Sequence, residues 1–552
     1  MRTRWPIALV WACCLARLAF YSSMLPLWEG YDEWSHFAVV RATAVSGRLL
    51  PPAVTPIPRD VEASFQLVPL PWEYRSMPWP SVTHEGYWQL PPEVRQAREA
   101  AFRALPVAWN RENGGGAWAA YETQQPPLYY WLAAPFLRVM SGRGLADQIL
   151  VLRWLGALVA SLAIPLVYRI GLRVFSDTRV ALGCAAVVAV MPAFAINVAR
   201  VGNDGVAVVL FTLLIWLGLE YLETGPCLRV SAALGVTLGL GLLTKAYFLT
   251  AVPALVWLVA AKRGQTHWKR GAAQNASVLF LMAAALAGWW YARNLLTTGT
   301  LAGLTESAML HGRGPLGMVR AAVTVPWVRA LDSVLFSHLY TGGWSWLTVR
   351  SWMYHLLYAV AGVAACGLWR AWRRPAVGWL LAVYFCFWLG ELYHVVLLFV
   401  TRGVATSMGW YLYAVVGAEV TLCVAGLSAI LPGKLRAGAA PAEVFLFALL
   451  DLYAAHAVAV PYYGGLIRHR PDGALAALHF AGLRSIGLPA LFQRLASFKG
   501  DFVSPRLLMG LWVTYAAATI VLVAAAMTAR GGYRTPQSRV FSGPPNRGSS
   551  RA

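Results

Sequence analysis

Long apolar segments recur along the chain and are separated by short polar or basic stretches. A helix needs about 20 residues to cross a bilayer core about 30 Å thick. Segments near this length predict an all-α polytopic membrane protein with about twelve transmembrane helices. Two of them, 229–245 and 247–261, are short enough to form a shallow hairpin instead. The segments occupy residues 6–28, 151–170, 179–199, 205–223, 229–245, 247–261, 272–292, 350–369, 376–397, 409–431, 440–460 and 506–528.

One further apolar stretch, 126–140, does not fit a span. It is about 15 residues long, which is short for a membrane crossing. Counting it as a span would also invert every later loop. We therefore expect an interfacial or re-entrant helix that belongs to the first long loop.

Basic residues predict the orientation of the helices. Cytoplasmic loops carry an excess of Lys and Arg, and the chain begins with the basic sequence Met1-Arg-Thr-Arg4. We expect this first helix to remain uncleaved, because its apolar run is longer than that of a signal peptide. Alternation from a cytoplasmic N-terminus then places the main basic clusters and both chain ends in the cytoplasm. The clusters are Arg169/Arg173/Arg179, Lys262/Arg263/Lys269/Arg270, Arg370/Arg373/Arg374 and Lys434/Arg436.

This topology divides the chain into eight parts, in which three long segments lie outside the cytoplasm and form a face that we expect to carry the chemistry. The parts are a first transmembrane helix (1–28), an extracytoplasmic loop with juxtamembrane helices (29–150), transmembrane helices 2–7 (151–292), a second loop (293–349), transmembrane helices 8–11 (350–460), a third loop (461–505), a twelfth helix (506–528) and a disordered cytoplasmic tail (529–552).

Composition agrees with a membrane protein. Only 13% of the residues are charged and the mean hydropathy is +0.54, whereas soluble proteins carry about 25% charged residues. The net charge of +22 would suggest nucleic acid in a soluble protein. Because the basic residues cluster between apolar segments, we interpret the charge as a topology signal and expect no nucleic-acid partner. Six of the seven cysteines lie in apolar segments, so we expect no disulfide and no cysteine metal site.

Four polar motifs fall on the predicted outside face. Directly after the first helix, Asp32 and Glu33 are followed by His36. Asp32 has an alternative interpretation as an ordinary helix cap. The four motifs are residues 29–37 (EGYDEWSHF), 122–130 (ETQQPPLYY), 200–205 (RVGNDG) and 289–294 (WWYARN).

The order of these motifs resembles the GT-C glycosyltransferases, polytopic enzymes that use polyprenyl-phosphate-linked sugars. They include dolichyl-phosphate-mannose protein mannosyltransferases and the lipid A aminoarabinose transferase. The resemblance covers roughly residues 1–300. It implies a GT-C fold with a large first extracytoplasmic loop, and sugar transfer from the lipid phosphate to a hydroxyl of a glycan, lipid or protein acceptor.

The resemblance also implies roles for particular residues. Asp32 matches the catalytic acid and Glu33 its neighbour, while Asn203 and Asp204 match a second acidic turn that contacts the substrate. This turn reads Asn-Asp-Gly instead of a pair of acids, and a hard cation needs several oxygen ligands. We therefore expect no certain cofactor, with a loosely bound divalent cation as an open alternative. His36 is expected near the substrate, either orienting Asp32 or as a structural partner.

The leaving group of such a reaction is a phosphate, which fixed cations stabilise. Lys245, Arg293 and Arg402, together with Arg200, lie on the predicted outside face, and we expect the first three to bind substrate. Lys245 has an alternative role as a side chain that snorkels to the interface, and Arg402 as an ordinary loop charge.

Ionisable residues inside predicted spans are costly unless they function or pair. Arg17, Glu419 and Asp451 belong to this group, and the sequence leaves both possibilities open.

A transporter or lipid flippase is the main alternative function. Transporters usually contain internal repeats with matched broken helices, and the sequence shows no such repeat. An enzyme should have Asp32, Asp204 and either Lys245 or Arg293 around one outward-facing cavity. The high Arg and Ala content suggests a GC-rich bacterial genome, and we expect the protein in the bacterial plasma membrane. The identity of the sugar, the acceptor and the oligomeric state do not follow from the sequence.

Overall fold

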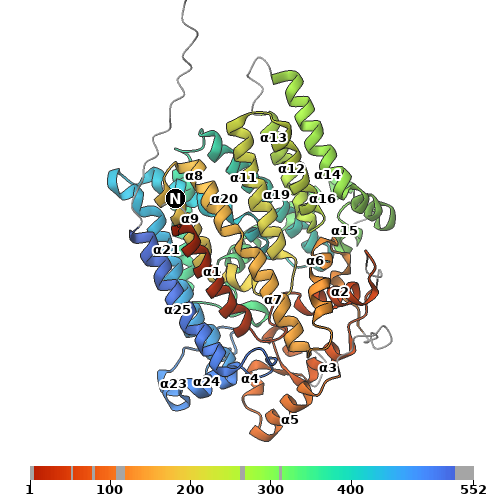
Figure 1. Ribbon diagram of the computed structural model, residues 1–552, viewed down its shortest axis with the longest axis vertical. Coiled ribbons are helices and arrows are strands. Elements are labelled where there is room, and N and C mark those ends of the chain that lie inside the picture. Colours follow the sequence, from red (N-terminus) through yellow and green to blue (C-terminus); the bar gives the residue numbers. More distant parts are fainter. Residues whose placement is uncertain are drawn as a thin grey trace, which may run out of the picture.

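The computed structural model describes residues 5–50, 54–76, 81–106, 118–260, 268–309 and 314–528. These residues are mostly helical, and the chain forms a tall bundle with the N-terminus near one end (Figure 1). The predicted disordered tail, 529–552, lies outside the described residues.

Within the described residues, nine helical segments are long and apolar enough to cross a membrane. They coincide with predicted apolar segments. They are α1 (Trp5–Met24), α7 (Leu145–Ser161) with α8 (Ala163–Phe175), α11 (Asp204–Thr224), α14 (Trp268–Thr298), α18 (Ser351–Leu368), α19 (Pro375–Arg402), η6 (Gly409–Val415) with α20 (Val416–Ile430), η7 (Gly433–Gly438) and α21 (Ala439–Tyr453) continuing through η8 (Ala454–Ala459) into α22 (Val460–Tyr463), and α25 (Pro505–Thr528).

The helices α9 (Thr178–Val190) and α10 (Pro192–Val198) would make a tenth span, bent by 61°. Pro192 stands at the start of α10, and proline lacks the N–H that would continue the helical hydrogen bonding. The two predicted short segments form α12 (Leu228–Leu242) and the pair η4 (Ala246–Thr250) and α13 (Ala251–Ala260). The polytopic, mostly helical fold is confirmed, with nine or ten candidate spans in the described residues, and the exact number of twelve stays a prediction.

The first long loop folds into short elements beneath the bundle. The predicted non-spanning stretch forms α6 (Leu128–Val139), which packs against α2 (Glu33–Ser46) and falls outside the candidate spans. Two short strands of this region, β1 (Pro69–Leu70) and β2 (Val82–Thr83), pair in parallel and form a two-stranded sheet. The remaining elements are α3 (Arg59–Leu67), η1 (Trp72–Ser76), α4 (His84–Tyr87), α5 (Pro92–Arg103) and η3 (Tyr121–Gln124).

The other two long segments are also built from short helices. Residues 293–349 contain the end of α14, then α15 (Thr305–Met309), α16 (Gly314–Thr324), α17 (Trp327–Leu339) and η5 (Gly343–Ser345). Residues 461–505 contain α23 (Phe480–Ile486) and α24 (Leu488–Leu495). In Figure 1, α4, α5, α23 and α24 lie together at the end of the bundle away from the N-terminus.

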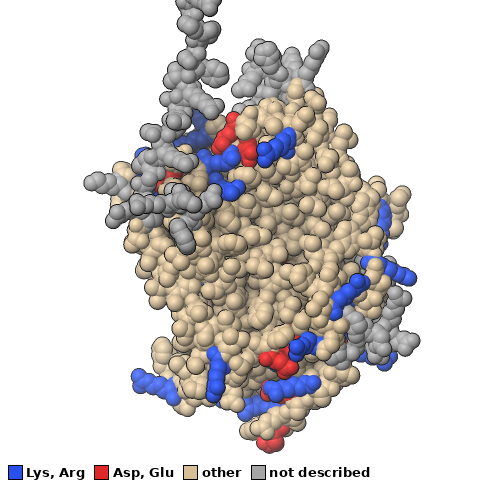
Figure 2. Space-filling view, in the orientation of Figure 1, with Lys and Arg blue, Asp and Glu red and all other residues tan. Residues whose placement is uncertain are grey.

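The surface shows where the bilayer lies. Charged side chains gather at the two ends of the visible face, and a broad band between them is almost free of charge (Figure 2). Large apolar side chains such as Leu281, Phe385 and Ile520 are well exposed. A contiguous apolar surface of this extent requires lipid as its solvent, and the chain is an integral membrane protein with multiple spans.

The buried ionisable groups form two pairs inside the bundle. Arg17 on α1 donates to both carboxylate oxygens of Asp451 on α21, at 2.6 and 2.9 Å, and both side chains are fully buried. Glu419 on α20 accepts a hydrogen bond of 2.6 Å from His338 on α17. Pairing therefore accounts for Arg17, Asp451 and Glu419, three of the residues whose role the sequence left open.

Candidate active site

A cavity of about 240 Å³ opens between the first loop and the end of α19. Its wall combines a polar side with an apolar one. The polar residues come from the start of α2, from η3, from the start of η4 and from α19, and the apolar ones mainly from η4 and α19. The lining includes Asp32, His36, Glu122, Gln125, Lys245, Tyr247, Leu249, Leu304, Phe387, Glu391, His394, Leu397 and Tyr411.

Asp32 faces this cavity because of an unusual backbone conformation. It has φ 58° and ψ 14°, in the left-handed region, at the position before α2 begins. Its side chain makes no capping hydrogen bond to the helix. Instead, Oδ1 accepts a hydrogen bond of 2.6 Å from the hydroxyl of Tyr121. Its place in the cavity wall is therefore not explained by a capping role.

The electrostatic surroundings of Asp32 suit a base. Burial raises the pKa of the Asp32 carboxyl above its ordinary value, while Arg200 and the Tyr121 hydrogen bond act in the opposite direction. A carboxylate with a raised pKa accepts a proton more readily at neutral pH.

The side chain of Glu33 lies in a different environment from that of Asp32. It is fully buried, and Arg153 on α7 donates to both of its oxygens at 2.7 and 2.5 Å. Glu33 also accepts bonds from the backbone N–H groups of Trp28 and Val201, at 3.1 and 3.0 Å. These four bonds tie the loop after α1 to α7 and to the turn before α11. The structure places Glu33 outside the residues that line the cavity.

Glu122 is a cavity residue that the sequence analysis did not select, although it begins one of the four motifs. It lies in η3 and is 7% exposed, and its Oε2 has no hydrogen-bond partner in the described structure. Nε2 of His36 is 3.8 Å away, while Nδ1 of His36 is 3.0 Å from the hydroxyl of Tyr130. Burial, followed by the charge of Asp32, raises the pKa of Glu122 to about 8. Burial, followed by the charge of Arg200, holds the pKa of His36 well below its usual value, so the imidazole is neutral at neutral pH.

The pKa of Glu122 predicts a pH dependence of stability. Between its ordinary value of 4.5 and about 8, the folded protein binds more protons at Glu122 than the unfolded chain does. Stability should therefore fall as the pH rises through this window. We expect Glu122→Gln to reduce this loss, measured as the difference in thermal unfolding midpoint between pH about 5 and pH about 8. The exposed Glu93→Gln is the control, and an equal pH slope in wild type and Glu122→Gln would contradict the prediction.

Asp204 and Arg200, which do not line the cavity, form a buried network with Lys245, which does. Asp204 begins α11 and accepts a hydrogen bond of 2.5 Å from Nζ of Lys245 through one oxygen. Its other oxygen accepts from Arg200, which also donates to the backbone carbonyl of Tyr31. This network links the residue before Asp32 to the lysine on the opposite wall.

The surroundings of Lys245 hold its ammonium in place. It lies 5.4 Å from the ring centroid of Tyr247 and 5.2 Å from that of Tyr411. Asn203 donates a hydrogen bond of 3.1 Å to the carbonyl of Thr244, the residue before Lys245. Asp32 and Lys245 thus line one cavity, and Asp204 supports Lys245 from behind.

The other two predicted cations lie elsewhere. The guanidinium of Arg293 is 4.9 Å from the ring centroid of Trp290. Arg402 pairs with Glu306, and its side chain is 60% exposed. Neither is among the residues that line the cavity.

The described residues contain no group of three or more His, Cys, Asp or Glu side chains arranged to hold a metal ion. Of the carboxylates near the cavity, Asp204 is neutralised by Lys245 and Arg200, while Glu122 keeps one oxygen without a hydrogen-bond partner.

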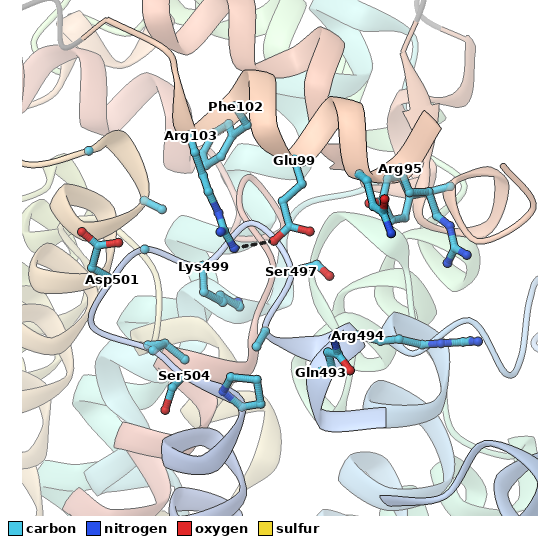
Figure 3. A pocket seen from close by; sticks show the side chains of 18 of the residues that line it. Arg95, Glu99, Phe102, Arg103, Gln493, Arg494, Ser497, Lys499, Asp501 and Ser504 are labelled. Atoms are coloured by element: carbon cyan, nitrogen blue, oxygen red, sulfur yellow. Dashed lines mark hydrogen bonds and ion pairs between the residues drawn. The ribbon is translucent and has the colours of Figure 1, made fainter. Parts of the chain in front are cut away.

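A second, larger cavity of about 750 Å³ lies at the same end of the bundle, between α5 and the segment that joins α24 to α25 (Figure 3). In its wall, the guanidinium of Arg103 donates a hydrogen bond of 2.8 Å to the carboxylate of Glu99. Lys499 donates to the carbonyls of Met24 and Leu25, at 3.1 and 2.5 Å, and so anchors this segment to the end of α1. None of the predicted site residues lines this second cavity.

Comparison with protein families finds a match for a segment that contributes part of the cavity lining. Residues 124–290 match the family described as dolichyl-phosphate-mannose-protein mannosyltransferase. This segment is therefore similar to that family. The match includes Gln125, Asp204 and Lys245 and covers less than half of the chain. The predicted resemblance to membrane glycosyltransferases, and with it the expectation of an enzyme, is confirmed. In sequence, the chain matches no curated protein.

Solved structures of two membrane glycosyltransferases resemble the whole bundle distantly. ArnT from Cupriavidus metallidurans, bound to undecaprenyl phosphate, has a TM-score of 0.47 and 13% identity over 96% of this chain and 75% of that one. The oligosaccharyltransferase AglB from Archaeoglobus fulgidus, in complex with an inhibitory peptide and a dolichol-phosphate, has a TM-score of 0.41 and 14% identity. That match covers 95% of this chain and 56% of AglB. At these TM-scores the assignment rests on the family match.

Proposed function

We propose that this protein transfers a sugar from a polyprenyl-phosphate donor to a hydroxyl group of a glycan, lipid or protein acceptor on the extracytoplasmic face of the membrane. The observation that carries the proposal is that one cavity holds both the carboxylate of Asp32 and the ammonium of Lys245. Sugar transfer from a phosphate needs both a base for the acceptor and a cation for the leaving group.

In this mechanism Asp32 takes the proton of the acceptor hydroxyl. The acceptor oxygen forms a bond to the anomeric carbon while the bond from that carbon to the phosphate oxygen breaks. The polyprenyl phosphate leaves with the electron pair, and Lys245 stabilises its negative charge. His36 is neutral and Glu122 is largely protonated below about pH 8, so we propose Asp32 as the base.

The two walls of the cavity suit the two parts of such a donor. Leu249, Phe387 and Leu397 line the apolar side, which fits a prenyl chain. The tyrosine rings of Tyr247 and Tyr411 lie beside Lys245, where an amphipathic aromatic ring can contact both a sugar and an apolar chain. The name of the matched family, with its dolichyl-phosphate-mannose donor, supports a donor of this chemical class.

The proposal is tested by incubating the purified protein, in vesicles, with polyprenyl-phosphate sugars labelled in the lipid and in the sugar. A transferase releases free polyprenyl phosphate and moves the label in the sugar to an acceptor from the membrane extract. A transporter or flippase would instead move intact donor across the vesicle membrane. Translocation of intact donor without release of polyprenyl phosphate would contradict the proposal and favour the alternative.

A lysine variant tests the leaving-group role. Lys245→Met removes the ammonium, and loss of one such stabilising group typically lowers kcat by about 10²–10³-fold. Lys245→Arg retains the charge and should keep more activity. Arg402→Gln removes a cation outside the cavity and should have little effect. Equal turnover of Lys245→Met and wild type at equal abundance would argue against the role of Lys245.

A further inference from the structure

A third cavity is lined in part by α8, α9 and α20, which lie near the N-terminus, at the end of the bundle away from α4 and α5 (Figure 1). It has a volume of about 450 Å³. Three connections between neighbouring helices contribute to its wall, from α8 to α9, from α18 to α19 and, through η7, from α20 to α21; the last turns of α20 also line it. The chain leaves or enters the bundle at this end in all three connections.

Three arginines from two of these connections line the cavity. Arg370 and Arg374 come from the α18–α19 connection, and Arg436 comes from η7. The Nε of Arg436 donates a hydrogen bond of 3.0 Å to the carbonyl of Leu431, which orients its side chain. No ion pair joins any of these three guanidinium groups to a carboxylate in the part of the chain that the structure describes.

One acidic residue, Asp177, also lines this cavity. Its Oδ1 accepts bonds from the backbone N–H groups of Arg179 and Val180, at 2.8 and 3.5 Å, and so caps α9. Helix N-termini stabilise a capping carboxylate, so Asp177 already has a structural role. Three positive charges against one negative charge leave the cavity with a net positive charge.

Two exposed tryptophans indicate the depth of this cavity in the membrane. Trp369 and Trp372 flank Arg370 in sequence, are 80% and 47% exposed, and have ring centroids 6.3 Å apart. Trp is enriched at the boundary between hydrocarbon and water, at the level of the lipid headgroups. The neighbouring Leu435 is 61% exposed, which also suits contact with lipid.

We propose that this cavity binds the phosphate of an anionic phospholipid headgroup. Guanidinium groups contact phosphate oxygens in pairs and hold phosphate more specifically than a point charge does. Basic pockets between transmembrane helices bind anionic headgroups by the same chemistry. A lipid is favoured over a soluble anion because the exposed tryptophans and leucine place apolar surface next to the arginines. This site is independent of the proposed transfer reaction.

The test compares lipid binding by the purified full-length protein and two neighbouring arginine variants. Phosphatidylglycerol and phosphatidylcholine are added to the delipidated protein in detergent, and retained lipid is counted by native mass spectrometry. Arg374→Gln removes a guanidinium from the cavity wall. Arg373→Gln removes an equal charge one residue away, since Arg373 is not in the wall and its guanidinium lies 5.6 Å from the ring centroid of Trp372.

We expect wild type to prefer phosphatidylglycerol to phosphatidylcholine. Arg374→Gln and Arg436→Gln should each weaken phosphatidylglycerol binding by at least about tenfold, as expected for loss of a hydrogen bond to a charged group, while Arg373→Gln should bind as wild type does. Circular dichroism and gel filtration of each variant establish that it is folded.

Three results would overturn the proposal. Equal binding of the two lipids would show that the charge of the headgroup is not recognised. An equal loss in Arg373→Gln and Arg374→Gln would show that only the overall surface charge matters. Displacement of phosphatidylglycerol by millimolar inorganic phosphate as effectively as by excess lipid would identify a site for a soluble anion instead.

Discussion

Asp32→Asn is expected to lower turnover by about 10²–10⁴-fold, the usual contribution of a general base, with protein abundance unchanged. The substitution keeps the size of the side chain and leaves an amide oxygen to accept the hydrogen bond of Tyr121. Asn also tolerates the left-handed backbone conformation that Asp32 adopts. The variant therefore removes the basic carboxylate and little else. Polyprenyl phosphate release from labelled donor, at matched protein amounts, measures the effect.

Tyr121→Phe is the matched control for this experiment. It removes the hydroxyl that bonds to Asp32 but leaves the carboxylate, so its effect on turnover should be much smaller. Asp32→Ala is less informative, because a β-carbon without a polar group is strained at φ 58°. Near-normal sugar transfer by Asp32→Asn would contradict the assignment of Asp32 as the base. Glu122 would then be the next candidate, because it also lines the cavity and Glu33 does not.

Glu33→Gln is expected to lower the stability of the protein, whereas Asp32→Asn is expected to lower its turnover. The Glu33 carboxylate is fully buried and paired with Arg153. Removing one partner of a buried ion pair leaves an uncompensated charge and typically costs about 3–5 kcal/mol. A loss of this size is a large part of the stability of many proteins. We expect a lower thermal unfolding midpoint and lower abundance in membranes.

The double variant Glu33→Gln/Arg153→Met distinguishes a structural pair from a catalytic one. Removing both charges eliminates the uncompensated guanidinium, so part of the lost stability should return. The recovered protein should still have most of its turnover per folded molecule. A Glu33→Gln variant that is as stable as wild type but inactive would mean that Glu33 takes part in the reaction, contrary to this interpretation.

The positions of the spans could be predicted from sequence because lipid imposes a length and a composition on each helix. The same argument identified α6 as too short to cross, although it is strongly apolar. The number of spans is less determined, because α12 and α13 have 15 and 10 residues and a length rule does not decide such cases. The orientation of the termini and the boundaries of the domains stay predictions.

The site was predictable in part. Asp32, His36 and Lys245 were selected from sequence and line one cavity, because motifs on the same face of a membrane can converge. The different positions of Asp32 and Glu33 were not predictable. Successive residues of a helix differ by about 100° in direction, and the left-handed conformation of Asp32 turns its side chain further from that of Glu33.

The choice among the cations also required the fold. Lys245, Arg293 and Arg402 all follow apolar segments on the same predicted face, and nothing in the local sequence separates them. Lys245 reaches the cavity because Asp204 and Asn203 hold the start of η4 against the start of α11. Such a contact joins residues 41 positions apart and leaves no periodic signal in the sequence.

The pairing of Arg17 with Asp451 has a consequence for biogenesis. The two residues are separated by 434 positions, so Arg17 is synthesised and reaches the membrane long before Asp451 is synthesised. An arginine in mid-membrane costs about 2.5–3.5 kcal/mol on insertion scales. Arg17 also donates to the carbonyls of Ala189 and Val190 at the end of α9, which is made much earlier than α21. We therefore expect α9 to supply the first hydrogen-bond partners of this arginine in the membrane, and its charge to be compensated only when α21 is inserted.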